Sequence, residues 1–359
     1  MLEQAGLKAL RLLDPERAHG LALKALAMGL AGRASGPDYP MLATEALGRT
    51  LRSPIGIAPG FDKHCEAVAQ TWALGPGFTE IGGVAPKPQP GNPKPRLFRL
   101  TADQGVINRF GFNSQGHAVV AERLRQYRHK GGDGVIGVNL AINKETTDPA
   151  EDYALGIAAF GHFADFLTVN VSSPNTKGLR DLQGEVALAN LLARAVAARE
   201  AIAAAPEVTR PPALLVKVAP DLDEAGIAAV ADVALSFKDK GLAGLVISNT
   251  TIARPPGLKS AEAAEAGGLS GQPLFEPSTA VLKAFAQRMQ GRMLLVGAGG
   301  VSSGVQAYAK IKAGATLVQL YSALVYGGPS LFRQITDELA ALAAKDGLTS
   351  ISEAIGQDL

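Results

Sequence analysis

Met293-Leu294-Leu295-Val296-Gly297-Ala298-Gly299-Gly300 carries the clearest signal of the fold in this sequence. An almost continuous apolar run ends there in a cluster of glycines, and a helix is predicted directly after it, at Val301–Tyr308. Such a run is typical of a strand that is buried on both faces, as in a parallel sheet. The stretch therefore indicates a buried parallel strand that leads through a glycine turn into a helix.

The same unit recurs along the chain. Seven further apolar runs lie at Pro54–Ala58, Phe78–Val84, Val135–Leu140, Phe166–Val171, Leu214–Val218, Gly244–Ser248 and Thr316–Tyr321. Helical stretches such as Val186–Ala204, Ala225–Lys238 and Ser278–Gln290 separate them. Strands that alternate with helices form parallel sheets, and eight of them predict an α/β fold of the closed (β/α)8 TIM barrel type. An open, doubly wound sheet is the alternative.

Length and composition limit the function classes. The chain has 359 residues, 47% hydrophobic and 19% charged, which is typical of a globular protein. Lys+Arg 35 against Asp+Glu 33 gives a net charge of +2, so nucleic acid is not expected as the main partner. A lone cysteine, Cys65, excludes an internal disulfide framework, an iron–sulfur cluster held by cysteines and a multi-cysteine zinc site. The histidines have no ligand spacing, so no metal site is expected at His19, His64, His117, His129 or His162.

Residues 1–40 are expected to form an N-terminal two-helix extension, followed by the barrel over residues 41–359. Asp14 is the predicted N-cap of the second helix and Pro15 its first residue. Neither helix has the run of about 20 apolar residues that a membrane span needs, and no export signal is recognisable. Both helices are apolar on more than one face. The hairpin therefore packs on the barrel, or it lies in a membrane surface and admits a lipid-soluble molecule.

Polar and small residues gather where the predicted strands end, which is where barrel enzymes place their catalytic groups. They are Pro59 to Lys63, Asn139, Asn143 and Lys144, Asn170 to Thr176, Lys217, Ser248 to Thr251, Gly297 to Gly300, and Tyr321 with Ser322. The last two groups follow the seventh and eighth strands. Free backbone N–H groups there predict a phosphate site.

Six asparagines are expected on this same face: Asn108, Asn113, Asn139, Asn170, Asn175 and Asn249. An amide both donates and accepts hydrogen bonds. A ring of amides suits a planar ligand with alternating N–H and C=O groups, such as a pyrimidine or a flavin ring.

Two side chains leave several chemistries open. Lys217 lies inside a buried strand, so it must pair with a carboxylate, act as a Schiff-base amine or neutralise an anionic cofactor. Lys63 is equally ambiguous because it adjoins Asp62. No histidine lies near Ser173 in the sequence, so a serine hydrolase is poorly supported and this serine would act without an adjacent imidazole.

Taken together, these motifs resemble the dihydroorotate dehydrogenase family from about Asp14 to about Pro329. The resemblance is carried by Pro86–Leu100, Asn108–Asn113 and Asn170–Thr176. It implies an FMN enzyme that oxidises (S)-dihydroorotate to orotate in de novo pyrimidine (UMP) biosynthesis. The sequence departs from related bacterial enzymes at Ala141-Ile142, where Gly-Lys is frequent.

The resemblance also implies a role for each matching residue. FMN would be held by Pro59, Gly60, Phe61, Asp62, Lys63, Gly83, Asn139, Asn170, Lys217, Ser248, Gly271, Gly300, Tyr321 and Ser322. Dihydroorotate would be held by Lys63, Asn108, Arg109, Phe110, Gly111, Phe112, Asn170, Asn175, Asn249 and Thr250. Ser173 would be the base, with Thr176 and water as its proton route, and Lys217 would stabilise negative charge on the flavin.

Two marks place the chain in the quinone-reducing, membrane-bound branch of the family: a serine base and the two-helix extension. The resemblance implies that His19, Arg99 and Tyr321 lie near the quinone passage. It also implies a monomeric peripheral protein whose N-terminal helices contact the lipid bilayer surface, at the cytoplasmic face of a bacterial inner membrane. Two rival functions remain. One is a flavin-free lyase or aldolase that uses Lys217, and the other is a non-catalytic barrel that binds a phosphometabolite.

Overall fold

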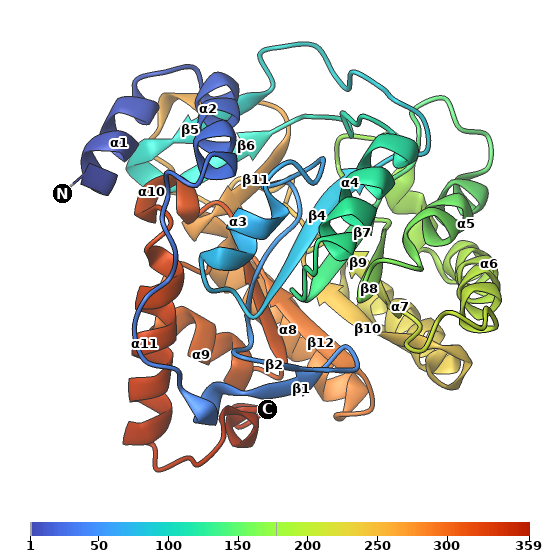
Figure 1. Cartoon of the computed structure of the whole chain (residues 1–359). Helices are drawn as coiled ribbons and strands as arrows, with labels where there is room; N and C mark the ends of the chain where they lie inside the picture. The colour runs from blue at the N-terminus through green and yellow to red at the C-terminus, as the bar shows by residue number, and fades with distance from the viewer. Residues whose placement is uncertain (1, 177) are drawn as a thin grey trace.

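Eight parallel strands close into a barrel in the computed structural model, which describes residues 2–176 and 178–359 (Figure 1). Around the barrel these are β3 (Ile55–Ile57), β4 (Phe78–Val84), β7 (Ile136–Leu140), β8 (Phe166–Asn170), β9 (Ala213–Val218), β10 (Leu242–Ile247), β12 (Leu294–Ala298) and β13 (Leu317–Leu320). Each of them coincides with a predicted apolar run. Because β13 pairs with β3, the sheet is closed, and the (β/α)8 prediction is confirmed over the open-sheet alternative.

Helices surround the barrel and connect its strands (Figure 1). They are α3 (Val68–Ala73), α4 (His117–His129), α5 (Pro149–Phe160), α6 (Glu185–Ala203), α7 (Glu224–Ser236), α8 (Phe275–Met289), α9 (Gly304–Lys312), α10 (Leu324–Gly327) and α11 (Leu331–Lys345). Short 3-10 helices are η1 (Pro40–Leu42), η2 (Thr101–Asp103), η3 (Leu179–Gln183), η4 (Lys238–Lys240), η5 (Ala261–Ala264), η6 (Gln272–Leu274) and η7 (Ile351–Ala354). Helix α9 begins at Gly304, not at Val301 as predicted, because the Ser303 side chain caps it by accepting from the Gln306 N–H.

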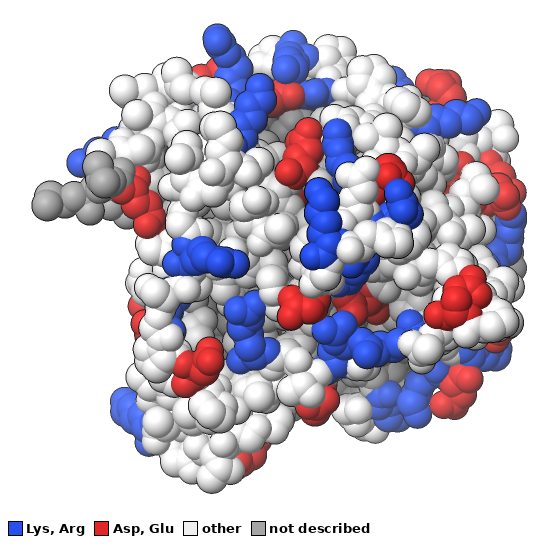
Figure 2. All heavy atoms as spheres, in the orientation of Figure 1, with Lys and Arg blue, Asp and Glu red and all other residues white. Residues whose placement is uncertain are grey.

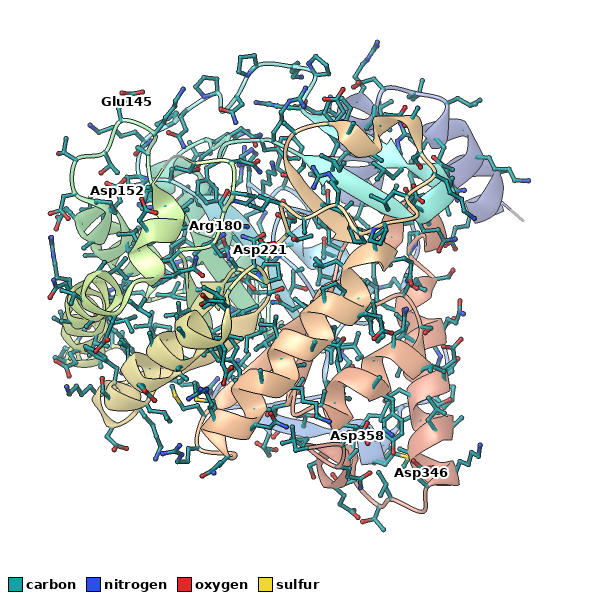
Figure 3. All side chains as sticks on the ribbon, turned by 180° about the vertical axis from the view of Figure 1, so that it is seen from behind. Glu145, Asp152, Arg180, Asp221, Asp346 and Asp358 are labelled. Carbon is teal, nitrogen blue, oxygen red and sulfur yellow. The ribbon has the colours of Figure 1, made fainter. Side chains whose placement is uncertain are left out.

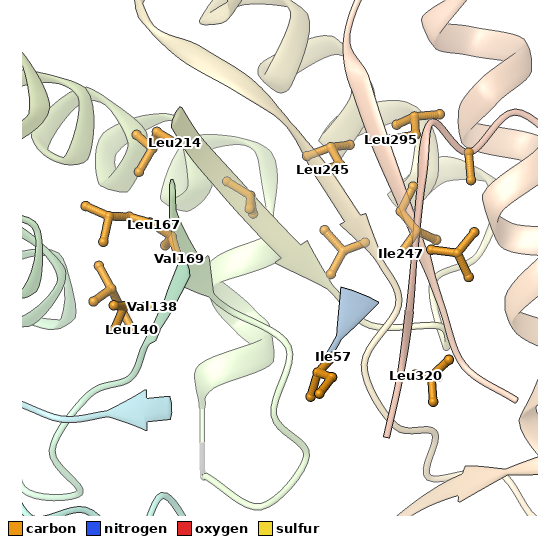
Figure 4. Close-up of a cluster of buried hydrophobic side chains, with 14 of the residues drawn as sticks. Ile57, Val138, Leu140, Leu167, Val169, Leu214, Leu245, Ile247, Leu295 and Leu320 are labelled. Atoms are coloured by element: carbon orange, nitrogen blue, oxygen red, sulfur yellow. The ribbon is translucent and has the colours of Figure 1, made fainter. Parts of the chain in front are cut away.

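The outer faces of the strands pack on the helices. Figure 4 shows this layer, in which residues such as Val138, Leu167 and Leu245 point away from the barrel axis. Because strand side chains alternate, the residues between them point inward. The strands read as continuous apolar runs because both faces are buried in the lower part of the barrel.

Two phenylalanines fill the lower barrel interior. Phe78 and Phe166 meet edge to face with ring centroids 6.0 Å apart. Space for them comes from glycines on neighbouring strands, since a Cβ on Gly137 would lie 2.1 Å from the Phe166 ring. Below the rings, the antiparallel hairpin of β1 (Thr44–Ala46) and β2 (Arg49–Leu51) closes this end of the barrel (Figure 1). The chemistry is therefore confined to the opposite end.

The proline-rich insertion Pro86–Asn113 contains strands that were not predicted. β5 (Leu97–Leu100) and β6 (Gly105–Asn108) pair with β11 (Gly268–Gly271) in a three-stranded antiparallel sheet. These strands are short, and β11 contains two glycines, so the sequence gives little strand signal. The sheet lies beyond the carboxyl ends of the barrel strands and covers that end (Figure 1).

The helices α1 (Leu2–Arg11) and α2 (Pro15–Ala27) lie beside this small sheet (Figure 1). As predicted, Pro15 begins α2 and Asp14 caps it, accepting from the Arg17 N–H at 2.9 Å. Glu16 of α2 pairs with the buried Arg96 guanidinium at 2.8 Å, which fastens the helix to the insertion. No helix among residues 2–176 and 178–359 has both the length and the apolar character needed to traverse a bilayer.

Charges of both signs are interspersed over the surface shown in Figure 2. This mixture agrees with the net charge of +2.

Candidate active site

A cavity of about 510 Å³ lies at the carboxyl ends of the barrel strands. Its walls come from the strand ends, the small sheet and the two N-terminal helices. The predicted site residues that line it are His19, Pro59, Gly60, Phe61, Lys63, Gly83, Arg99, Asn108, Phe110, Gly111, Phe112, Asn139, Asn170, Ser173, Asn175, Lys217, Ser248, Asn249, Thr250, Gly271, Gly300, Tyr321 and Ser322. The structure thus brings together residues from loops that are far apart in the sequence.

Of the residues expected to hold FMN, dihydroorotate or quinone, Asp62 and Arg109 lie outside the cavity lining, as does Thr176, the expected proton route from Ser173. The buried Asp62 carboxylate accepts the backbone N–H groups of Glu66 and Ala67, both at 2.8 Å, and so shapes the turn after β3. Arg109 pairs with Glu265 at 2.7 Å. Asp62 therefore shapes the site by fixing the backbone of a loop that lines it, and Arg109 does so by linking the end of β6 to the segment that contains Glu265.

A line of hydrogen-bonded amides crosses the floor of the cavity and ends at a carboxylate. Glu80, fully buried on β4, accepts from Asn139 Nδ2 at 2.8 Å. Asn139 Oδ1 then accepts from Asn170 Nδ2 at 2.8 Å, and Asn170 Oδ1 accepts from Asn249 Nδ2 at 3.3 Å. A carboxylate only accepts, so it fixes which edge each amide presents. Glu80 was not predicted, although a charged residue within the run Phe78–Val84 is the same signal that singled out Lys217.

Lys217 lies beside Asn170 in the barrel register and is 5% exposed. Within the described chain Lys217 forms no ion pair, and the nearby Glu80 carboxylate accepts from Asn139 and Gln319. Burial lowers the pKa of Lys217, while the nearby Glu80 charge opposes that shift. The structural ion pair considered from the sequence is therefore not formed. Without a carboxylate partner, the Lys217 ammonium is available to an anionic ligand.

The glycine turn after β12 forms a compact cradle. Gly299 and Gly300 have φ values of 106° and 78°, a region that favours glycine. A Cβ on Gly300 would lie 2.5 Å from Phe275 backbone atoms. In the part of the chain that the structure describes, the Gly299, Gly300 and Ser322 N–H groups donate to no protein acceptor. The predicted phosphate loops therefore present free donors from two adjacent turns.

A buried lysine stands behind this cradle. Lys310 on α9 is 0% exposed and donates to Ser278 Oγ at 2.9 Å, and that hydroxyl lies 3.1 Å from the Gly299 carbonyl oxygen. Burial lowers the pKa of Lys310 to about 7. It was not predicted, since it falls in a helix with no other unusual feature.

Ser173 lies on the loop after β8 and is 7% exposed. Its Oγ accepts the Asn175 N–H at 3.3 Å, and the Asn175 side chain donates to the Asn108 carbonyl at 3.1 Å. This pairing joins the serine loop to strand β6 of the small sheet. As expected from the sequence, no imidazole among the described residues is bonded to the serine.

At the other end of the cavity, three aromatic rings from α2 and the barrel meet. Phe61 and Tyr321 have ring centroids 5.8 Å apart, and His19 Nδ1 lies 3.4 Å from Tyr321 Oη. Burial lowers the pKa of His19 to about 4, so the ring is neutral at pH 7. Arg99 donates to the Arg11 carbonyl at 2.6 Å and to the Leu13 carbonyl. It thereby holds the turn between α1 and α2 against the small sheet.

No cluster of three or more His, Cys, Asp or Glu side chains suited to a metal ion occurs in the described ranges.

The fold is a (β/α)8 barrel whose strand ends carry an amide-lined cavity beside a glycine turn with free N–H donors. The family model of dihydroorotate dehydrogenase matches residues 41–342. The dihydroorotate dehydrogenase (quinone) of Azorhizobium caulinodans is 50% identical over 350 residues, covering 98% of this chain and 97% of that protein. The chain belongs to the dihydroorotate dehydrogenase family, in its quinone-dependent class, and is an oxidoreductase.

Other relatives agree with this assignment. The mitochondrial dihydroorotate dehydrogenase (quinone) of Mus musculus is 48% identical over 356 residues, which cover 97% of this chain and 88% of that protein. The crystal structure of DHODH in complex with ferulenol from Eimeria tenella matches with a TM-score of 0.91 and 39% identity, covering 96% of both chains. The resemblance inferred from the motifs is therefore confirmed along almost the whole chain.

Proposed function

We propose that this enzyme oxidises (S)-dihydroorotate to orotate in de novo pyrimidine biosynthesis, with FMN as cofactor and a membrane quinone as final electron acceptor. The observation that carries the proposal is that one cavity joins a phosphate cradle, a line of amides, a buried lysine and an isolated serine. The family is flavin-dependent, and the names of its relatives specify dihydroorotate and quinone.

The residues present fit FMN. The free N–H groups of Gly299, Gly300 and Ser322 suit its phosphate, and the glycines leave the space that a Cβ would fill. The buried Gln319 Oε1 has no hydrogen-bond partner among the described residues and lines the cavity, so it suits a ring N–H donor. Lys217 and Asn139 would lie at the ring, where Lys217 stabilises negative charge. When bound, FMN would supply the two-electron redox chemistry that connects oxidation of the substrate to reduction of the quinone.

The substrate residues fit dihydroorotate in the same way. The Lys63 ammonium would bind the carboxylate, and the Asn108, Asn175 and Asn249 amides would bind the ring N–H and C=O groups. The carbonyl next to C5 acidifies its proton, which Ser173 Oγ would remove while hydride leaves C6. A serine is a weak base, so the proton passes on to Thr176 or water.

The quinone is proposed to enter between α1, α2 and the barrel, past His19, Arg99 and Tyr321. Support comes from the exposed apolar side chains of this hairpin: Leu12 is 88% exposed, Leu30 73% and Met28 69%. Such a surface suits the interfacial region of a bilayer. We therefore propose peripheral attachment through residues 1–40, at the cytoplasmic face of a bacterial inner membrane. A monomer suffices, since residues of one chain line the cavity.

An absorbance spectrum of the purified protein tests the proposal. We expect a flavin spectrum, release of FMN on acid denaturation, anaerobic bleaching by dihydroorotate and recovery of colour with quinone. A colourless protein that releases no FMN contradicts it. The lyase or aldolase alternative instead predicts that borohydride traps a carbonyl substrate on Lys217, and a barrel that only binds a phosphometabolite predicts no turnover.

A further inference from the structure

Arg180, in η3, joins three loops around the substrate end of the cavity. Its Nε donates to the Ser172 carbonyl at 3.1 Å, and its Nη2 donates to the Thr250 carbonyl at 3.0 Å. Its Nη1 pairs with Asp221 at 2.8 Å. Figure 3 shows Arg180 and Asp221 next to each other at the ends of the barrel strands. The loops after β8, β9 and β10 thus converge on one guanidinium.

The partner carboxylate is itself held in place. Asp221 also accepts from the Thr251 hydroxyl, and the side chains of Arg180 and Asp221 are only 21% and 19% exposed. A planar guanidinium offers its donors in a fixed fork, which an ammonium cannot reproduce. The contact therefore constrains direction as well as charge.

Ser172 is fixed from both sides. Its hydroxyl donates to Asn170 Oδ1 at 2.8 Å and accepts from Asn249 Nδ2 at 2.9 Å, inside the cavity wall. On the outer side, Arg180 binds its carbonyl oxygen. The peptide between Ser172 and Ser173 is consequently held in one orientation, and this peptide carries the serine that faces the cavity.

We propose that Arg180 is a positioning residue for proton removal. By binding the Ser172 carbonyl, Arg180 orients Ser173 Oγ toward the substrate. By binding the Thr250 carbonyl, it holds the loop after β10, which would bind the substrate, at a fixed distance from the Ser173 loop. Asp221 completes the arrangement by orienting the guanidinium. This inference rests on the proposed function. The pair carries no net charge, so the effect is geometric and leaves the flavin end of the cavity unaffected.

The test measures the two half-reactions of the full-length holoenzyme separately, for wild type, Arg180→Lys and Asp221→Asn. Misplacing a reacting group by about 1 Å costs on the order of 100-fold in rate. We expect flavin bleaching by dihydroorotate to slow about 10- to 100-fold in Arg180→Lys. FMN content and reoxidation by quinone should stay within about twofold of wild type. The variant changes the position of Ser173 and not its proton affinity. The bleaching rate should therefore be lower at every pH, with the same midpoints of its pH profile as in wild type.

Matched variants complete the test. Arg194→Lys alters an exposed arginine with two carboxylate partners on the outer helices and should leave both half-reactions unchanged. The Arg180→Lys, Asp221→Asn double variant should be no slower than the slower single variant, because both act through one unit. An unchanged bleaching rate, or equal slowing of both half-reactions, overturns the role of Arg180. Wild-type protein that dihydroorotate does not bleach instead overturns the proposed function.

Discussion

The Lys63 ammonium nitrogen lies 3.4 Å from the centroid of the Phe110 ring, within the range of a cation–π contact. It also donates to Asn113 Oδ1 at 2.6 Å. Lys63 therefore does not pair with its neighbour Asp62, which was one alternative from the sequence. Neither partner carries a negative charge, so no ion pair neutralises the ammonium and it can bind an anionic ligand.

Orotate binding should weaken as pH rises above about 7. Burial, followed by the charge of Arg96, lowers the pKa of Lys63 to about 7. A bound carboxylate raises that pKa, so the proton is retained in the complex and lost from the free enzyme. The apparent Kd should stay low below pH 7 and rise by up to about tenfold per pH unit above it. Spectral titration of the flavin with orotate from pH 6 to 9 measures this, and Lys63→Met should bind weakly with a flat profile.

Ser173→Ala should slow flavin bleaching by dihydroorotate by about 100- to 10,000-fold, which is the usual contribution of a general base. FMN content and reoxidation by quinone should not change, because the serine is proposed to act on the substrate alone. Anaerobic stopped-flow absorbance measures both rates. An unaltered bleaching rate would remove Ser173 from the role of base.

Glu80→Leu should destabilise the protein by about 1–3 kcal/mol, since it leaves the Asn139 amide without an acceptor in a buried site. The substitution should also weaken orotate binding, because without the Glu80 carboxylate the orientation of the hydrogen-bonded amides is no longer fixed. Glu80→Gln keeps one carbonyl acceptor and should lie closer to wild type in both respects. Urea denaturation and orotate titration compare the variants, and equal behaviour of the two would contradict the role given to the carboxylate.

Gly137→Ala should cost about 1–3 kcal/mol of stability, the usual penalty for overpacking. The added methyl would lie 2.1 Å from the Phe166 ring inside the barrel. Gly20→Ala is the matched control, because a Cβ there meets nothing within 4 Å in the interior of α2. It should stabilise the helix by about 0.5–1 kcal/mol. Opposite shifts of the unfolding midpoint are expected, and a shift in the same direction would contradict the packing argument.

Leu12→Glu combined with Leu30→Glu should reduce binding to lipid vesicles by about tenfold or more, because each leucine loses a transfer free energy of about 1.5–3 kcal/mol. Val186→Glu is the control, since Val186 is 73% exposed on α6, outside the hairpin. Vesicle sedimentation measures the difference. Equal binding of both variants would mean that residues 1–40 do not form the membrane contact.

The barrel could be predicted from the sequence because each strand is buried on both faces and so reads as an apolar run. That the asparagines, Lys217 and Ser173 line one cavity could be predicted, because polar residues at strand ends converge in this fold. The small sheet could not, since all three of its strands have weak local preference and β6 pairs with β11, which lies far away in the chain. Arg180 was missed for a similar reason. It binds backbone carbonyl groups of other loops, and the sequence does not indicate which loops lie next to it.

The amides that run from Asn249 to Glu80 all point the same way, each giving its NH2 group toward the carboxylate. Reversing one would set donor against donor along the line, so the order of donors and acceptors facing the cavity is locked. A planar ring that fits this order does not fit it when turned over. Under the proposed function, a carboxylate buried beneath the site thus helps to decide which face of the ligand meets the flavin.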